Sequence, residues 1–222
     1  MASTIVYDSL VHSIILPALK GKMAELNTDN FISSALDSHL SIMERNVVEN
    51  KKLIFDFVDK LCNCVLQGGK ILWCGNGGSA AESQHMSAEL MGRFNFDRDP
   101  ISSIALTTDT SYITAVGNDL DYSEIFARQI QGLANKVDVL VLMSTSGNSR
   151  NIIKAATTAN SMGVLTLAML GRDGGQVAEL CDLKIIVDSS DTPRIQEVHQ
   201  FMGHIICDLL EQKLKTRMIK TQ

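Results

Sequence analysis

The sequence predicts an α/β protein with a doubly wound parallel sheet of five strands, flanked by helices and preceded by N-terminal helices. Two observations predict this fold class. Short apolar runs bounded by turn residues recur along the chain, and amphipathic helical patterns separate most of them. Continuous apolar runs are typical of strands covered on both faces, as the strands of a parallel sheet are.

The predicted elements follow one another from residue 31 to residue 215. Apolar residues recur every three or four positions over 31–47 and 54–65, which indicates two helices before the first strand. The predicted strands are 71–74, 104–106, 137–143, 164–169 and 183–187. The remaining helices are 80–93, 123–133, 149–162 and 193–215. Pro193 suits the first turn of the last helix.

Composition and charge exclude several classes of protein. The 222 residues carry 20 basic and 25 acidic side chains, and a net charge of −5 argues against nucleic-acid or anionic-membrane binding. No apolar run approaches the ~20 residues of a membrane span. Five cysteines without a CxxC pair favour a reducing cytoplasm over a disulfide framework. We expect an N-terminal extension over 1–29 and a single domain over 30–222.

A glycine-rich turn joins the first predicted strand to a helix. Its residues are Cys74-Gly75-Asn76-Gly77-Gly78-Ser79. Open α/β sheets bind ligands at the carboxyl ends of their strands, and a helix N-terminus offers free N–H groups to an anion. The alternative is a plain turn with Ser79 as the N-cap. The spacing does not match the GxGxxG dinucleotide fingerprint.

A second loop, Ser144-Thr145-Ser146-Gly147-Asn148-Ser149, also follows a buried strand and opens a helix. Four hydroxyls and a glycine at a helix start form a compact cradle for a phosphate group. The loop lacks the lysine of a P-loop, which argues against hydrolysis of a nucleoside triphosphate. A hydrophilic loop with one capping serine is the alternative, although capping needs only one hydroxyl.

Titratable side chains cluster on two of the predicted helices. His85 and Glu89 are four residues apart and therefore share a helix face, where they can ligate a metal, supply a base, or form a surface pair. His204 lies among aliphatic residues and needs a polar partner. Gln196 lies eight residues before His204, about 12 Å along a helix. Either Gln196 lies at the frayed start of the helix or neighbouring subunits supply different groups, and we favour a site assembled at a subunit interface.

Three further side chains are weaker candidates for contacts with a substrate. Asn118 and Asp119 follow Gly117 in what reads as a turn, where Asp119 can bond a sugar hydroxyl or stabilise the turn itself. Arg93 ends the helix of His85 and Glu89, where it can pair with an anion or with the helix C-terminus.

Together these motifs resemble the SIS (sugar isomerase) domain family, over about residues 31–214. The resemblance implies the SIS fold, a flavodoxin-like three-layer arrangement. It implies Glu89 and His204 as catalytic residues, and His85, Glu89, Gln196 and His204 as ligands of one zinc ion per subunit. The substrate contacts that it implies are Asn76, Gly77, Gly78, Ser79, Glu89, Arg93, Asn118, Asp119, Ser144, Thr145, Ser146, Ser149 and Gln196.

The family members that this chain resembles most isomerise a phosphorylated seven-carbon sugar through a cis-enediol. The resemblance therefore implies an aldose–ketose isomerase that converts sedoheptulose 7-phosphate to D-glycero-D-manno-heptose 7-phosphate for bacterial surface heptose. It also implies a cytoplasmic homotetramer. Before Arg194, where the family can carry an acidic residue, this chain has Thr192-Pro193, with Asp191 just upstream.

Three alternatives share the fold. The first is a non-catalytic binding protein similar to the DnaA initiator-associating protein, which has non-titrating residues at the positions of Glu89 and His204. Because this chain has both titratable groups, we favour catalysis. The second is an isomerase of another phosphosugar. The third is a sugar-phosphate sensor, but such proteins usually carry a basic DNA-binding region, which is not visible here.

Overall fold

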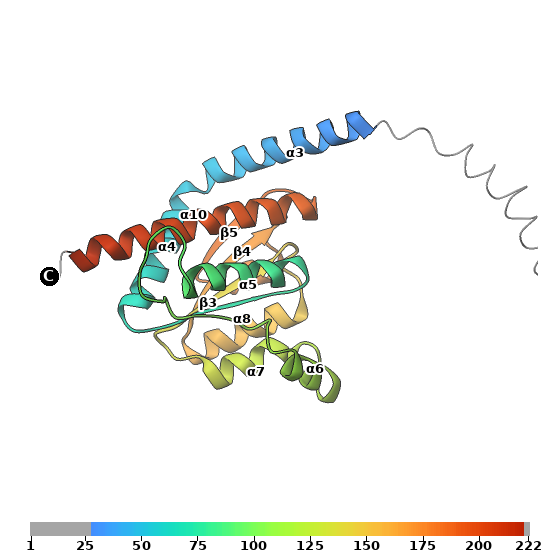
Figure 1. Ribbon diagram of the computed structural model, residues 1–222. Helices are drawn as coiled ribbons and strands as arrows, with labels where there is room; N and C mark the ends of the chain where they lie inside the picture. The colour runs from blue at the N-terminus through green and yellow to red at the C-terminus, as the bar shows by residue number, and fades with distance from the viewer. Residues whose placement is uncertain (1–27, 220–222) are drawn as a thin grey trace, which may run out of the picture. The chain divides into compact units, whose positions relative to one another are not determined.

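The computed structural model describes residues 28–219, so the predicted extension lies almost wholly outside the described residues (Figure 1). The parallel five-stranded sheet is confirmed. Its strands are β1 (Ile71–Gly75), β2 (Ser103–Ala105), β3 (Val139–Ser144), β4 (Leu165–Gly171) and β5 (Leu183–Val187). The helices are α3 (Thr28–Glu49), α4 (Lys51–Leu66), α5 (Gly78–Met91), α6 (Thr110–Asp119), α7 (Glu124–Leu133), α8 (Arg150–Met162), α9 (Gly175–Ala178) and α10 (Thr192–Ile219). Within 28–219, no helix has the length and apolar character needed to cross a membrane.

The strand order places the two predicted loops side by side. The sheet runs β2-β1-β3-β4-β5 with every neighbouring pair parallel. In the pairing of β1 with β3, Gly75 lies opposite Met143. The order of the chain reverses between these two strands, and ligands of doubly wound sheets bind outside the carboxyl ends at such a switch point. The glycine-rich loop follows β1 and the hydroxyl-rich loop follows β3.

Helices cover both faces of the sheet, which explains the continuous apolar runs. Successive residues of β1 alternate between two cores: Ile71 and Trp73 pack with α4, α5 and α10, whereas Leu72 and Cys74 pack with α6, α7 and α8. Figure 1 shows α5 and α10 in one helical layer and α7 and α8 in the other. Because both faces of the sheet are buried, apolar residues follow one another without interruption along a strand instead of alternating with polar ones.

The described residues fall into two units that divide between Leu40 and Ser41, and the second unit contains the sheet. Helix α3 ends in the second unit. There Asn46 is fully buried; its side chain donates to the carbonyl of Ile42 at 2.9 Å and accepts from the N–H of Asp188 at 2.7 Å. These bonds attach the end of α3 to the segment that follows β5.

Two helices, α6 and α9, have no counterpart among the predicted elements. The carboxylate of Asp109 caps α6 by accepting from the N–H of Tyr112 at 2.9 Å. The helix is rich in threonine, β-branched residues and glycine, which have weak helix propensity, so its sequence does not show a helical pattern. The turn predicted at Asn118 and Asp119 is the last turn of α6 instead.

Candidate active site

Glycines shape the turn from β1 into α5. Gly77, the N-cap residue of α5, has a φ of 55°, in the left-handed region that favours glycine. A Cβ on Gly78 would lie 2.2 Å from the side-chain nitrogen of Gln196, so a larger residue there would displace the Gln196 amide. The N-cap predicted at Ser79 is wrong, because Ser79 lies buried inside the first turn of α5. No side chain caps this helix, which leaves its first N–H groups for a ligand.

The hydroxyl-rich loop after β3 uses two of its hydroxyls to hold its own shape. The Ser144 hydroxyl accepts from the N–H of Gly147 at 3.0 Å, and the Ser146 hydroxyl accepts from the N–H of Asn148 at 3.2 Å. Ser149 is the N-cap residue of α8, yet its side chain makes no capping hydrogen bond. The hydroxyl of Ser149 therefore remains for a ligand at the start of α8.

A pair of side-chain amides joins the two loops. The Asn76 amide nitrogen donates to the Asn151 oxygen at 2.8 Å, and the Asn151 nitrogen donates back to the Asn76 oxygen at 2.7 Å. Asn151 is 2% exposed, and the Tyr122 hydroxyl donates to the same Asn76 oxygen at 3.2 Å. The side chain of Asn76, predicted as a substrate contact, therefore bridges the loops in this structure. Asn151 was not among the predicted site residues.

His85, Glu89 and His204 meet between α5 and α10, which lie side by side (Figure 1). The His85 Nε2 atom lies 2.9 Å from the Glu89 Oε1 atom and 3.3 Å from the His204 Nε2 atom. One ligand atom from each of the three side chains lies within 4.8 Å of the others. The imidazole of His204 also stacks on the Phe94 ring, with centroids 5.6 Å apart. One chain supplies all three groups of this cluster.

The cluster can hold a metal ion. Two nitrogen ligands of a tetrahedral zinc ion, each about 2.0 to 2.1 Å from the metal, lie about 3.3 Å apart. The 3.3 Å separation of the two histidine Nε2 atoms matches that span. Two imidazoles and a carboxylate also form a common donor set for catalytic zinc. His85, Glu89 and His204 therefore fit zinc in both chemistry and spacing.

Gln196 and Gln200 lie on the same face of α10 as His204, at intervals of four residues, but in different surroundings. The amide of Gln196, the predicted fourth ligand, lies against Gly78 at the glycine-rich loop. The amide nitrogen of Gln200 instead lies 2.9 Å from His85 Nδ1 and 3.1 Å from His204 Nε2. We did not predict Gln200 as a site residue. Its spacing of four residues from both Gln196 and His204 is the signal that could have found it.

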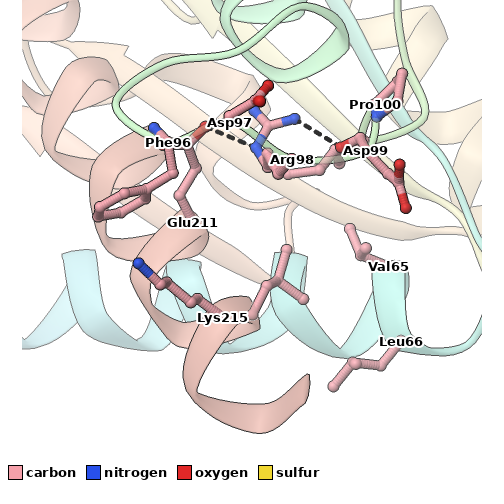
Figure 2. Close-up of a pocket in the computed structure, with 11 residues that line it drawn as sticks. Val65, Leu66, Phe96, Asp97, Arg98, Asp99, Pro100, Glu211 and Lys215 are labelled. Atoms are coloured by element: carbon pink, nitrogen blue, oxygen red, sulfur yellow. Dashed lines mark hydrogen bonds and ion pairs between the residues drawn. The ribbon is translucent and has the colours of Figure 1, made fainter. Parts of the chain in front are cut away.

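An arginine and a buried glutamate fix the C-terminal end of α5 to α10 (Figure 2). Glu211 on α10 has a fully buried side chain and pairs with Arg98 at 2.6 Å. Arg98 also donates to the carbonyls of Glu89 at 3.0 Å and Leu90 at 2.8 Å. Burial raises the pKa of Glu211, but the N–H groups of Asn95 and Phe94 together with Arg98 outweigh burial and hold that pKa below its ordinary value.

The pocket in Figure 2 lies beside this ion pair, among α4, α10 and residues 96–101. Its volume is 820 Å³, and its lining includes Val65, Phe96 and Lys215. The lining includes neither of the two loops and none of His85, Glu89 and His204. The pocket is therefore separate from the candidate active site.

Three of the other predicted contacts lie on exposed positions, whereas Thr145 in the hydroxyl-rich loop is half-buried. Arg93 follows the end of α5 and is exposed, and it is Arg98 that donates to the last carbonyls of α5. Asn118 and Asp119 are exposed at the end of α6, where the Asn118 amide donates to the Asp119 carboxylate at 2.8 Å. These three residues are open to solvent in the single chain.

Two buried titratable groups lie on the helices of the cluster. Burial raises the pKa of Glu82, on α5, to about 8. One Glu82 carboxylate oxygen has no hydrogen-bond partner within the described part of the chain. Burial lowers the pKa of His199, on α10, to about 4, against a small opposing effect of its 3.0 Å bond to the Leu170 carbonyl. Both groups are therefore expected to be uncharged at neutral pH.

Known proteins are similar to this chain in sequence and in fold. The SIS domain family model matches residues 36–171. The phosphoheptose isomerase of Sulfurimonas denitrificans is 48% identical over 175 residues, which cover 78% of this chain and 90% of that protein. The enzyme of the same name from Helicobacter pylori strain P12 is 46% identical over 184 residues, covering 83% and 96%. A solved phosphoheptose isomerase from Neisseria gonorrhoeae has a TM-score of 0.80 and 34% identity, covering 84% of this chain and all of the other.

The parallel sheet with two loops at its switch point places this chain among the doubly wound α/β domains, and the family model shows that it belongs to the SIS domain family. Within that family, its curated relatives at 43–52% identity are named phosphoheptose isomerases. These matches do not favour the three alternatives given above, which are a non-catalytic binding protein, an isomerase of another phosphosugar and a sugar-phosphate sensor.

Proposed function

We propose that the protein converts sedoheptulose 7-phosphate to D-glycero-D-manno-heptose 7-phosphate, an aldose–ketose isomerisation that supplies heptose for lipopolysaccharide and other bacterial surface polysaccharides. The observation that carries the proposal is the cluster of His85, Glu89 and His204, two of which lie on the helix that starts in the glycine-rich loop. Relatives that are 46–48% identical over about four-fifths of the chain are named phosphoheptose isomerase.

Glu89 is the proposed general base. Isomerisation moves a proton between C1 and C2 of the open-chain sugar, through a cis-enediol, and one carboxylate beside these carbons can take the proton and return it. One Glu89 oxygen contacts His85 at 2.9 Å, and its side chain is 24% exposed. The carboxylate is thus held in place and remains accessible to a substrate.

His204 is the proposed partner that moves the second proton, between the oxygens on C1 and C2. Its ring is held by Phe94, His85 and Gln200, which leaves it little rotational freedom. The hydroxyl-rich loop and the N-terminus of α8 would bind the phosphate, and the glycine-rich loop would contact the sugar. Binding energy from the phosphate end then orients the reacting carbons.

We propose that His85, Glu89, Gln196 and His204 hold one zinc ion per subunit. The donor chemistry and the 3.3 Å separation of the two Nε2 atoms support the first, second and fourth of these ligands. When bound, zinc would polarise the carbonyl oxygen of the open-chain sugar. His85 and Glu89 would then both act as ligands, and the shared zinc ion would orient the Glu89 carboxylate.

We also propose a cytoplasmic homotetramer, as the family resemblance implies. Apolar side chains on α3 support association between copies of the chain, because Phe31, Ile32, Leu36 and Leu40 are each more than half exposed. Arg93, Asn118 and Asp119 would reach substrate where subunits meet, since they are solvent-exposed in the single chain.

The direct test is turnover of sedoheptulose 7-phosphate by the purified protein, with Glu89→Gln and His204→Ala beside it. We expect wild-type turnover and a loss of at least about a hundredfold in kcat in each variant, because each removes a proton-transfer group. Glu179→Gln is the matched control, because the Glu179 side chain is 86% exposed on the surface. A wild-type protein that is assembled, supplied with zinc and inactive would contradict the proposal.

A further inference from the structure

Gln200 contacts both imidazoles of the histidine cluster, although the sequence motifs give it no role. It lies on α10 one turn before His204 and on the same helix stripe. Its amide nitrogen contacts His85 Nδ1 at 2.9 Å and His204 Nε2 at 3.1 Å. One side chain thus bridges an imidazole of α5 and an imidazole of α10.

Hydrogen-bond chemistry determines which way this amide faces. An amide NH₂ only donates, so both contacted ring nitrogens must accept. His85 then carries its proton on Nε2, which lies 2.9 Å from the Glu89 carboxylate, an obligate acceptor. With the amide reversed, a neutral His85 would present an unprotonated Nε2 to that carboxylate, and two acceptors would face each other. With His85 neutral and no metal bound, the amide nitrogen therefore faces the imidazoles.

Metal binding reverses that requirement. A histidine ligates a metal through an unprotonated nitrogen and donates its other ring N–H to a second group, which fixes the ring. If His85 uses Nε2 as a ligand, its Nδ1 carries the proton and needs an acceptor. The Gln200 side chain already lies against Nδ1, and a rotation of its terminal amide presents oxygen in place of nitrogen.

We propose that Gln200 is a positioning residue of the zinc site, whose reversible amide donates to His85 Nδ1 without metal and accepts from it when zinc is bound. This inference rests on the zinc site of the proposed function. His204 has Phe94 stacked against its ring as a second restraint. His85 is 44% exposed, so the loss of Gln200 should affect it more.

The test is zinc affinity, measured by competition with a chelator on the full-length protein without substrate. We expect Gln200→Leu to bind zinc about 10- to 100-fold more weakly, the usual effect of losing such a partner. Gln200→Glu keeps an acceptor for the Nδ1 proton and should bind at least as tightly as wild type. Gln212→Leu is the matched control, since Gln212 is exposed on the same helix and its side-chain amide donates to Asp208 at 2.9 Å, away from the cluster.

A second readout separates positioning from a structural effect or from direct ligation. In zinc-loaded protein, the NMR signal of the His85 Nδ1 proton should exchange with water faster in Gln200→Leu than in wild type. Equal exchange rates, or zinc affinities within twofold of wild type, would overturn the inference. A wild-type protein that binds no zinc would also overturn it, whereas turnover of sedoheptulose 7-phosphate tests the proposed activity separately.

Discussion

The reciprocal amide pair of Asn76 and Asn151 joins the two ligand loops through a few atoms. Each side chain both donates to and accepts from the other, at 2.8 and 2.7 Å, and Asn151 is buried. A buried amide that loses its partner keeps unsatisfied polar atoms, which costs about 1 to 3 kcal/mol. The pair therefore holds the carboxyl ends of β1 and β3 at a fixed spacing.

Replacing Asn151 with alanine should loosen the glycine-rich loop. We expect KM for the phosphosugar to rise about tenfold, with a smaller fall in kcat, because Asn151 touches the loop rather than the proton-transfer groups. Steady-state kinetics measure both parameters. Thr157→Ala, on the exposed side of α8, is the control. An unchanged KM would show that the pair does not support substrate binding.

Between elements, Arg98 and Glu211 link the two helices that carry the cluster. Arg98 donates to the carbonyl of Glu89 itself, and Glu211 lies on α10 two turns beyond His204. Glu211 also accepts from the N–H groups of Phe94, Asn95 and Phe96. Because both charges are removed from water, breaking the pair from one side is costly.

We expect Arg98→Met to destabilise the protein by about 3 kcal/mol, because it leaves the buried Glu211 carboxylate without its cation. The double variant Arg98→Met/Glu211→Gln should recover part of that loss. Urea unfolding of the wild type, both single variants and the double variant measures the coupling. Strictly additive losses would mean that the two side chains do not act as a pair.

For the whole molecule, two buried groups give stability a dependence on pH. Glu82 has a pKa of about 8 when folded and near 4.5 when unfolded, so the folded state holds an extra proton between these values. Stability from Glu82 is therefore lost as pH rises from 4.5 to 8. His199, with a pKa near 4 when folded and 6.5 when unfolded, loses stability as pH falls from 6.5 to 4.

Between pH 6.5 and 8, the protonation of Glu82 changes the stability of the protein, whereas His199 no longer contributes a change of its own. We expect the free energy of unfolding to fall across this window, and Glu82→Gln to flatten the fall, because glutamine has no proton to lose. Chemical denaturation at a series of pH values measures the slope, with Glu179→Gln as the surface control. A slope in Glu82→Gln equal to that of wild type would contradict the assignment.

Assembly of the molecule is predicted to depend on α3. We expect the double substitution Leu36→Glu/Leu40→Glu to reduce the proposed tetramer to smaller species, because it places charge on an exposed apolar helix face. Light scattering after gel filtration measures the mass. Glu44→Gln is the control, because it replaces one exposed polar side chain of the same helix by another of the same size. A tetramer that survives the double substitution would exclude this face as an interface.

Sequence patterning predicted the elements that depend on local signals. Buried strands such as β3 show continuous apolar runs, and the two loops carry recognisable turn and hydroxyl residues. Helix α6 was missed because its residues have weak helix propensity, although Asp109 supplies a cap at its start. Arg98 and Gln200 were missed because their partners, Glu211 and His85, lie more than a hundred residues away in the chain.

The central claim is that this protein isomerises a phosphorylated sugar by proton transfer through Glu89. It is tested most directly by converting sedoheptulose 7-phosphate in D₂O and analysing the product by NMR. Because a carboxylate base exchanges its proton with solvent, the account predicts deuterium on the carbon that receives the transferred proton. Product that forms at the normal rate without any solvent deuterium, or no product at all, would contradict it.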